Sequence, residues 1–123
     1  MSKHEKLWGS VTILNEGHNY RVKEIVVLPG EDTSIESHDF RTEIIHIVGG
    51  HGEIAFKKEA HGELFVKHIR YGDQFTIPEF MVHNIRNTNG EDLILIQVEF
   101  GSWLSDEDVT HWVSNMSGMH RKS

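Results

Sequence analysis

The stretch that decides the fold is Gly72-Asp73-Gln74-Phe75-Thr76-Ile77-Pro78-Glu79-Phe80-Met81-Val82-His83-Asn84-Ile85-Arg86-Asn87. A glycine that permits a turn leads into a short apolar strand, and Pro78 stops the pairing of that strand. A second strand begins near His83 and can point the imidazole inward, while Asn87 suits the turn that follows. The stretch therefore predicts two short strands and an inward histidine, which is either a ligand in a pocket or a hydrogen-bonded residue of the interior.

A second segment of similar shape lies upstream, between Pro29 and Gly50. It contains a glycine before a short strand and two potential metal ligands, His38 and Glu43. Regular alternation places residues five apart on opposite faces of a strand, so these two can act together only across a bulge or bend. His46 lies three residues beyond Glu43 and is a poor partner for it, so we expect His46 to face solvent or the space between sheets.

Size, charge and composition limit what the chain can be. With 123 residues it is long enough for one core, so we expect a single domain over residues 1–123. The net charge of -7 argues against a nucleic-acid partner, because phosphate contacts need clustered cations. No run is apolar enough to span a membrane or to act as a signal peptide, which predicts a cytoplasmic protein. Since there is no cysteine, any metal must be held by His and carboxylate.

The remaining pattern predicts an all-β protein. Runs rich in Val, Ile, Phe and Thr recur at intervals of roughly ten residues, with Gly, Pro, Asn and Asp between them. The predicted strands are Ser10 to Leu14, Tyr20 to Leu28, Thr33 to Ser37, Thr42 to Val48, Gly52 to Lys58, Leu64 to Arg70, Gln74 to Ile77, His83 to Asn87 and Asp92 to Phe100. Hairpin turns are expected at 15–18, 59–62 and 87–90, because Asn and Gly tolerate positive φ.

The C-terminal part of the sequence favours a different element. Ser105 precedes three acidic residues, a pattern typical of a helix start, and Val109, Trp112 and Val113 follow at helical spacing. We therefore expect a barrel core over about 6–104, a short helix over about 105–113 and a polar tail at 117–123 that frays.

The stretch Gly72 to Asn87 resembles the second motif of cupins, proteins built on a double-stranded β-barrel. That motif has a Gly, five residues, a Pro, one residue, a Gly, two residues, a His, three residues and an Asn. Gly72, Pro78, His83 and Asn87 hold this spacing, with Phe80 in place of the second glycine. The resemblance implies a jelly-roll-like cupin barrel.

The upstream segment resembles the first cupin motif, which reads Gly, His-x-His, Glu and a further Gly. The positions that can be placed are Gly30, His38, Glu43 and Gly50. If His38 is the first histidine, Phe40 stands where the second belongs. With three residues before Glu43, Asp39 holds the second place instead and Ser37 the first.

Three outcomes are open for the metal site. His38, Glu43 and His83 can hold a divalent ion such as Zn, Mn, Co or Fe, as two histidines and one carboxylate do in other proteins. Asp39 can substitute as a further ligand, since carboxylate oxygen also binds divalent ions. Otherwise the barrel is metal-free, with His38 and His83 as acid/base or hydrogen-bonding groups.

A closer resemblance is carried by the segments Lys6-Leu7-Trp8-Gly9-Ser10, Tyr20 to Glu31, Ser34 to Glu43 and Gly101 to Val109. Together they are similar to the cupin domain of type II mannose-6-phosphate isomerases, which also forms the C-terminal part of bifunctional mannose-1-phosphate guanylyltransferases. The family has three consecutive histidines before Arg-x-Glu, and here only His38 remains, followed by Asp39 and Phe40.

This family resemblance implies isomerisation of a phosphosugar between aldose and ketose at a divalent metal. Glu43 and His83 are then the expected catalytic residues, and Lys23 and Arg41, together with Lys6, are expected to bind the phosphate.

Two alternatives stay open. One is a module that binds a sugar or another small molecule without turnover, with Phe40 stacking on the ligand inside the barrel. The other is a structural or dimerisation domain that uses Trp103 and Trp112 at an interface. Because cupins are often dimers, the resemblance also implies a homodimer.

Overall fold

A computed structural model describes residues 2–115 and 118–121, and every regular element in these ranges is a strand. The strands are β1 (Ser2–Lys6), β2 (Gly9–Glu16), β3 (Tyr20–Val27), β4 (Ile35–Ser37), β5 (Arg41–Gly49), β6 (His51–Lys57), β7 (Leu64–Arg70), β8 (Gln74–Ile77), β9 (Val82–Arg86), β10 (Leu93–Gly101), β11 (Thr110–Asn115) and β12 (Gly118–Arg121). None of the described residues belongs to a helix suited in length and apolar character to crossing a bilayer.

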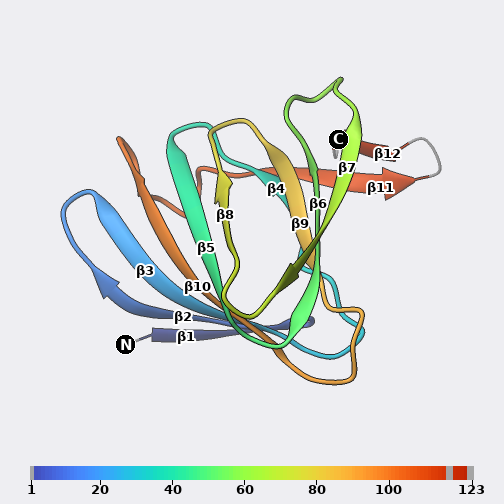
Figure 1. Ribbon diagram of the computed structural model, residues 1–123. Helices are drawn as coiled ribbons and strands as arrows, with labels where there is room; N and C mark the ends of the chain where they lie inside the picture. Colours follow the sequence, from blue (N-terminus) through green and yellow to red (C-terminus); the bar gives the residue numbers. More distant parts are fainter. Residues whose placement is uncertain (1, 116–117, 122–123) are drawn as a thin grey trace.

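The strands form two antiparallel sheets that face each other (Figure 1). The first sheet has the order β1-β2-β3-β10-β5-β8, and the second has the order β12-β11-β4-β9-β6-β7. Strands β5 and β6 are consecutive in sequence but belong to different sheets, as do β9 and β10, so the chain crosses between the layers as a jelly roll does. The all-β fold expected from the sequence is confirmed.

The nine strands predicted from the sequence correspond to β2 through β10, each to within two residues. The hairpin expected at 87–90 is wrong, because β9 and β10 lie in different sheets and this turn carries the chain between them. Asn87 is buried there, and its amide nitrogen donates to the carbonyls of Val27 (2.9 Å) and Glu91 (2.6 Å). Its side chain thus fixes the crossing. Strand β1 escaped prediction because its residues are polar and exposed throughout.

The helix expected over 105–113 is also wrong. Only a tight turn forms at its start, where the Asp108 amide donates to the Ser105 carbonyl, and β11 then pairs with β4. Bulky and β-branched residues suit this strand, and the Trp112 indole donates to the Ser37 hydroxyl at 2.9 Å. Where the sequence predicted a fraying tail, Gly118–Arg121 pairs with β11 as β12. Ser117, Lys122 and Ser123 lie outside the described residues.

The apolar core occupies one end of the space between the sheets. Its buried members, apart from Met81 in the turn before β9, come from alternate positions of facing strands, as expected when one face of each strand packs inward. They are Ile25, Val27, Ile45, Ile47, Ile54, Ile69, Ile77, Met81, Ile85, Leu93 and Leu95. Burial of each such side chain contributes about 1.5–3 kcal/mol, so this cluster holds the sheets together. The other end of the same space is lined by charged and polar residues.

Candidate metal and sugar site

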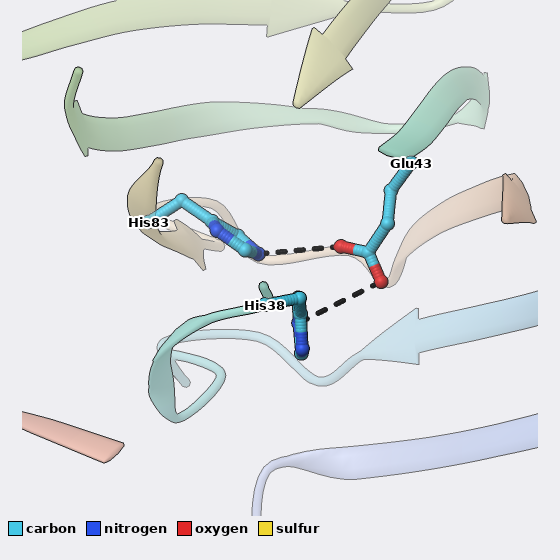
Figure 2. Close-up of side chains that lie close together, drawn as sticks. All are labelled: His38, Glu43 and His83. Carbon is cyan, nitrogen blue, oxygen red and sulfur yellow. Dashed lines mark ion pairs between the residues drawn. The ribbon is translucent and has the colours of Figure 1, made fainter. Parts of the chain in front are cut away.

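Three buried side chains converge at the polar end of the barrel. Glu43 lies on β5, His83 lies on β9, and His38 follows the last residue of β4. Their ligand atoms all lie within 4.8 Å of one another, and Figure 2 shows the two imidazoles directed at the Glu43 carboxylate. A bend at Asp39 and Phe40 separates β4 from β5, which removes the conflict that strict alternation posed for His38 and Glu43.

Both imidazoles are oriented by hydrogen bonds from their Nδ1 atoms. His38 Nδ1 lies 2.6 Å from the Asp108 carbonyl, and His83 Nδ1 lies 3.1 Å from the Met81 carbonyl. A carbonyl can only accept, so each Nδ1 carries the proton and each neutral ring presents the lone pair of Nε2. Histidines that ligate metals are usually held in this way.

The spacing around Glu43 suits ligands of one ion better than direct hydrogen bonds. His83 Nε2 lies 3.5 Å from Glu43 Oε1, and His38 Nε2 lies 3.7 Å from Glu43 Oε2. Two ligands that each lie about 2.1 Å from a common ion are roughly 3 to 3.6 Å apart. The donor set of two imidazoles and one carboxylate is one that divalent transition metals use. The three residues therefore fit a metal.

The protonation equilibria of the three groups are coupled. Burial opposes ionisation of Glu43, but the nearby His83, His38 and Arg41 outweigh it and lower the pKa of Glu43. Burial lowers the pKa of His38, with Glu43 only partly opposing this. His83 differs from His38. Burial alone would lower the pKa of His83, but the interaction with Glu43 outweighs burial and raises it. Glu43 is thus an anion at neutral pH.

Glu36 is the site residue that the sequence reasoning missed. It lies on β4, its Oε1 is 3.7 Å from His38 Nε2, and its Oε2 is 4.0 Å from His111 Nδ1. The signal was available: a gap of four residues before Glu43 puts His38 at the second histidine of the cupin motif and Glu36 at the first. Five residues separate Gly30 from Glu36. A carboxylate thus stands at the motif position of the missing imidazole, outside the group formed by His38, Glu43 and His83.

Asp39 and Phe40 lie outside this group. Both are exposed, and the Phe40 ring packs edge-on against Trp103 with ring centroids 5.7 Å apart. The expectation that Phe40 stacks on a ligand inside the barrel is therefore wrong, and the Asp39 carboxylate is not among the grouped ligands. Of the two tryptophans considered for an interface, Trp112 packs within the chain while Trp103 is 45% exposed.

The bend after His38 is held by four hydrogen bonds, three to Asp108 and one from Phe80. The Asp108 carboxylate accepts hydrogen bonds from the amides of Asp39 (2.9 Å) and Phe40 (3.1 Å), and its carbonyl accepts from His38. The Phe80 amide donates to the His38 carbonyl at 2.8 Å. Phe80 has a φ of 70°, a left-handed conformation that explains why the motif prefers glycine there.

Lys23 and Arg41, the expected phosphate ligands, lie buried beside the site and are already paired. Lys23 Nζ lies 3.1 Å from Glu99 Oε2. Arg41 donates from Nε to Glu43 Oε2 at 3.1 Å, and its Nη2 lies 3.3 Å from His38 Nε2 and 3.4 Å from Glu99. Gln97 bridges the two acids, since its amide nitrogen is 3.1 Å from oxygens of both. Sequence alone could not reveal this network, because it joins three strands.

These side chains line a cavity of about 320 Å³ between the sheets. The lining includes Glu36, His38, Glu43 and His83, together with Lys6 of β1, Trp8 from the turn between β1 and β2, and apolar residues of β2. A cavity with an apolar wall and a few convergent polar groups is the usual form of a small-molecule site.

Comparison with known proteins agrees with this geometry. A mannose-1-phosphate guanylyltransferase of Salmonella typhimurium is 31% identical over 105 residues, which are 85% of this chain and 21% of that protein. The alginate biosynthesis protein AlgA of Pseudomonas putida is 30% identical over 102 residues, 83% of this chain and 20% of that protein. The chain thus spans about a fifth of the length of the curated relatives it matches.

Solved structures of low sequence identity share the fold. The capsular polysaccharide assembling protein CapF of Staphylococcus aureus has a TM-score of 0.78 at 20% identity, covering 88% of this chain and 30% of that chain. An oxalate decarboxylase of Lactobacillus farciminis has a TM-score of 0.75 at 22% identity, covering 85% and 32%. The cupin fold is therefore confirmed. The model of the family described as mannose-6-phosphate isomerase C-terminal matches residues 2–114, and the chain belongs to that family.

Proposed function

We propose that this chain interconverts the aldose and ketose forms of a phosphosugar at a divalent metal held by His38, Glu43 and His83. The observation that carries the proposal is the convergence of two Nε2 lone pairs and an ionised carboxylate within 4.8 Å at a cavity wall. The names of the family and of its guanylyltransferase relatives point to mannose phosphates as the substrate class.

The bound metal would supply polarisation of the sugar carbonyl, which stabilises the enediolate that this reaction passes through. Zn, Mn, Co and Fe all accept imidazole and carboxylate ligands. The protein supports such an ion through the hydrogen bonds from His38 and His83 to backbone carbonyls, which direct both Nε2 atoms toward Glu43.

Moving the proton between adjacent sugar carbons needs a group that reaches the substrate. Glu43 and His83 were the expected catalytic residues, but Glu43 Oε2 already accepts from Arg41 and Gln97, and its Oε1 faces His83. Glu36 is freer: it lines the cavity, its side chain is 30% exposed, and His111 lies 4.0 Å away. We assign proton transfer to Glu36 with His111 as its partner.

The proposal is tested by metal analysis of the purified protein and a coupled assay with mannose 6-phosphate. We expect about one divalent ion per chain, its loss in His83→Ala, and turnover that requires it. Glu36→Gln should keep the ion and lose at least roughly a hundredfold in kcat, because general acid-base catalysis contributes about that much. Equal, metal-free preparations of wild type and His83→Ala would refute the metal site.

A second function, ligand binding without turnover, is favoured by the position of Arg41. Its guanidinium donates to Glu43 Oε2 and reaches His38 Nε2, so a cation already contacts two of the three ligand residues. A domain that holds the sugar by hydrogen bonds alone would look the same. Binding of mannose 6-phosphate to metal-free protein, with no turnover when Zn, Mn or Co is added, would decide for this second function.

A further inference from the structure

We propose that the anionic group of the substrate is bound by Lys6 on β1, with Trp8 as the apolar wall beside it, and not by Lys23 or Arg41. The inference rests on the proposed function and specifies how the cavity distinguishes a sugar phosphate from a neutral sugar. It assigns a binding role to the corner between β1 and β2, whose Lys6 and Trp8 line the same cavity as Glu36, His38 and Glu43.

The first argument is charge compensation. Three Lys and Arg side chains line the cavity: Lys6, Lys23 and Arg41. Lys23 pairs with Glu99, and Arg41 pairs with Glu43 and Glu99, so an incoming phosphate would have to compete with buried carboxylates for both. Within the described part of the chain, no carboxylate forms an ion pair with Lys6. Its charge is available to a ligand.

The second argument is the alternation of β1. His4 and Lys6 line the cavity, whereas Lys3 and Glu5 occupy the alternate positions and pair with each other at 3.5 Å. Successive strand residues point to opposite faces, so the ammonium of Lys6 and the ring of His4 share the face of the cavity. Lys6 is therefore directed to the cavity, while Lys3 is paired with Glu5 on the other face of the strand.

The third argument is the corner itself. Lys6 pairs with Gly9 across the strand register, so only Leu7 and Trp8 connect β1 to β2. A Cβ at Gly9 would lie 1.8 Å from the Val26 carbonyl oxygen, so β2 approaches β3 too closely for any side chain at this position. Trp8 is packed against the core and lines the cavity, where its ring offers a flat apolar surface to a sugar. Cation and ring are thus presented together.

The test compares Lys6→Ala with Lys3→Ala, a matched loss of one lysine from the opposite face of the same strand. Binding of mannose 6-phosphate, mannose and inorganic phosphate is measured by titration calorimetry. We expect Lys6→Ala to weaken mannose 6-phosphate roughly five- to tenfold and to leave mannose unchanged, while Lys3→Ala changes neither. Lys6→Arg should restore binding to within about threefold, because it keeps the charge.

The proposal is overturned if Lys6→Ala binds mannose 6-phosphate as wild type does, if it weakens mannose equally, or if wild type binds neither phosphate compound. Its failure is distinct from that of the isomerase proposal. Wild type that prefers mannose 6-phosphate over mannose through Lys6 yet never isomerises it would support this subsite and refute the isomerase. Turnover unaffected by Lys6→Ala, in both kcat and KM, would support the isomerase and refute the subsite.

Discussion

Along strands β3, β10 and β5 the inward side chains change from apolar to charged within a few residues. One row across the three strands reads Ile25, Leu95 and Ile47, and two rows further it reads Arg21, Glu99 and Glu43. Backbone pairing is the same in both rows. The same three strands therefore have two roles. Their apolar side chains pack the core at one end of the barrel, and their charged side chains form the candidate site at the other end.

The charged row gives the largest expected effect. Glu99 is fully buried and faces Arg21, Lys23 and Arg41 together. Glu99→Gln keeps the volume but leaves three buried cations with one fewer anion, so we expect a loss of about 3–5 kcal/mol in the free energy of unfolding. Urea denaturation measures it. Glu24→Gln, on the outward face of β3, is the control and should cost little. A loss below about 1 kcal/mol for Glu99→Gln would show that water or anions replace the carboxylate.

The apolar row should follow closely. Leu95 is fully buried in the core on the same strand as Glu99, so Leu95→Ala should lower the free energy of unfolding by about 2–4 kcal/mol through lost packing and a residual cavity. The folded fraction should keep its full metal content, since Leu95 touches the site only through the strand it shares. Ile96→Ala, at the alternate position, is the control and should cost less. Loss of metal in Leu95→Ala would show that the two ends of the barrel are not independent.

The apolar end was predictable from sequence, and the charged end was not. Alternating Ile, Val and Leu marked β3, β5 and β10 correctly because apolar periodicity reports which face is buried. The same alternation continues through Arg21 and Lys23, but charged residues normally face water, so the pattern there gives no sign of an inward face. Their burial is compensated by ion pairs between distant segments, which join Arg21 and Lys23 of β3 to Glu99 of β10.

The candidate site shows the same division. The spacing from Gly72 to Asn87 located His83, because a motif fixes distances along one segment. Phe40 was placed inside the barrel because the bend after β4 is invisible in local sequence, and it depends on Asp108, which is 68 residues away from Phe40. Asp108 itself was assigned to a helix start, where acids are common. Contacts between remote segments therefore account for the misplacement of Phe40 and Asp108, whereas Glu36 was missed although a local spacing pointed to it.

The contribution of the charged end to the free energy of unfolding should depend on pH, because Glu43 and His83 titrate, whereas that of the apolar end should not. Its lowered pKa means that ionised Glu43 stabilises the fold above about pH 4.5, and this contribution is lost as the pH falls toward the lowered value. The raised pKa of His83 adds stability that is complete below pH 6.5 and is lost as the pH rises through the raised value. The free-energy difference between metal-free wild type and Glu43→Gln should therefore be largest between about pH 4.5 and 6.5, at about 1–3 kcal/mol.

Urea denaturation in the presence of a chelator, repeated from acidic to alkaline pH, measures this difference. His38 has a lowered pKa, so the folded state resists its protonation. This residue therefore lowers the free energy of unfolding as the pH falls below 6.5. Leu95→Ala is the matched control, because it should shift the stability by a nearly constant amount at every pH. A difference between wild type and Glu43→Gln that is equally constant would contradict the coupling of Glu43 to His83.

The smallest expected effect on stability lies at the edge of the charged end, in Asp108→Asn. The Asp108 carboxylate accepts from the amides of Asp39 and Phe40 with one oxygen each, and the amide of Asn can accept with only one atom. One backbone donor in the bend loses its partner, so the free energy of unfolding should fall by only about 1 kcal/mol. Metal affinity should also fall, by roughly tenfold, because the bend sets the position of the His38 ring while the barrel stays intact.

Asp106→Asn is the control, since Asp106 is exposed and contacts only Arg21 at 3.4 Å among the described residues. A large loss of stability without a change in metal affinity would mean that the bend supports the barrel and not the site, and the division between the two ends would have to be redrawn.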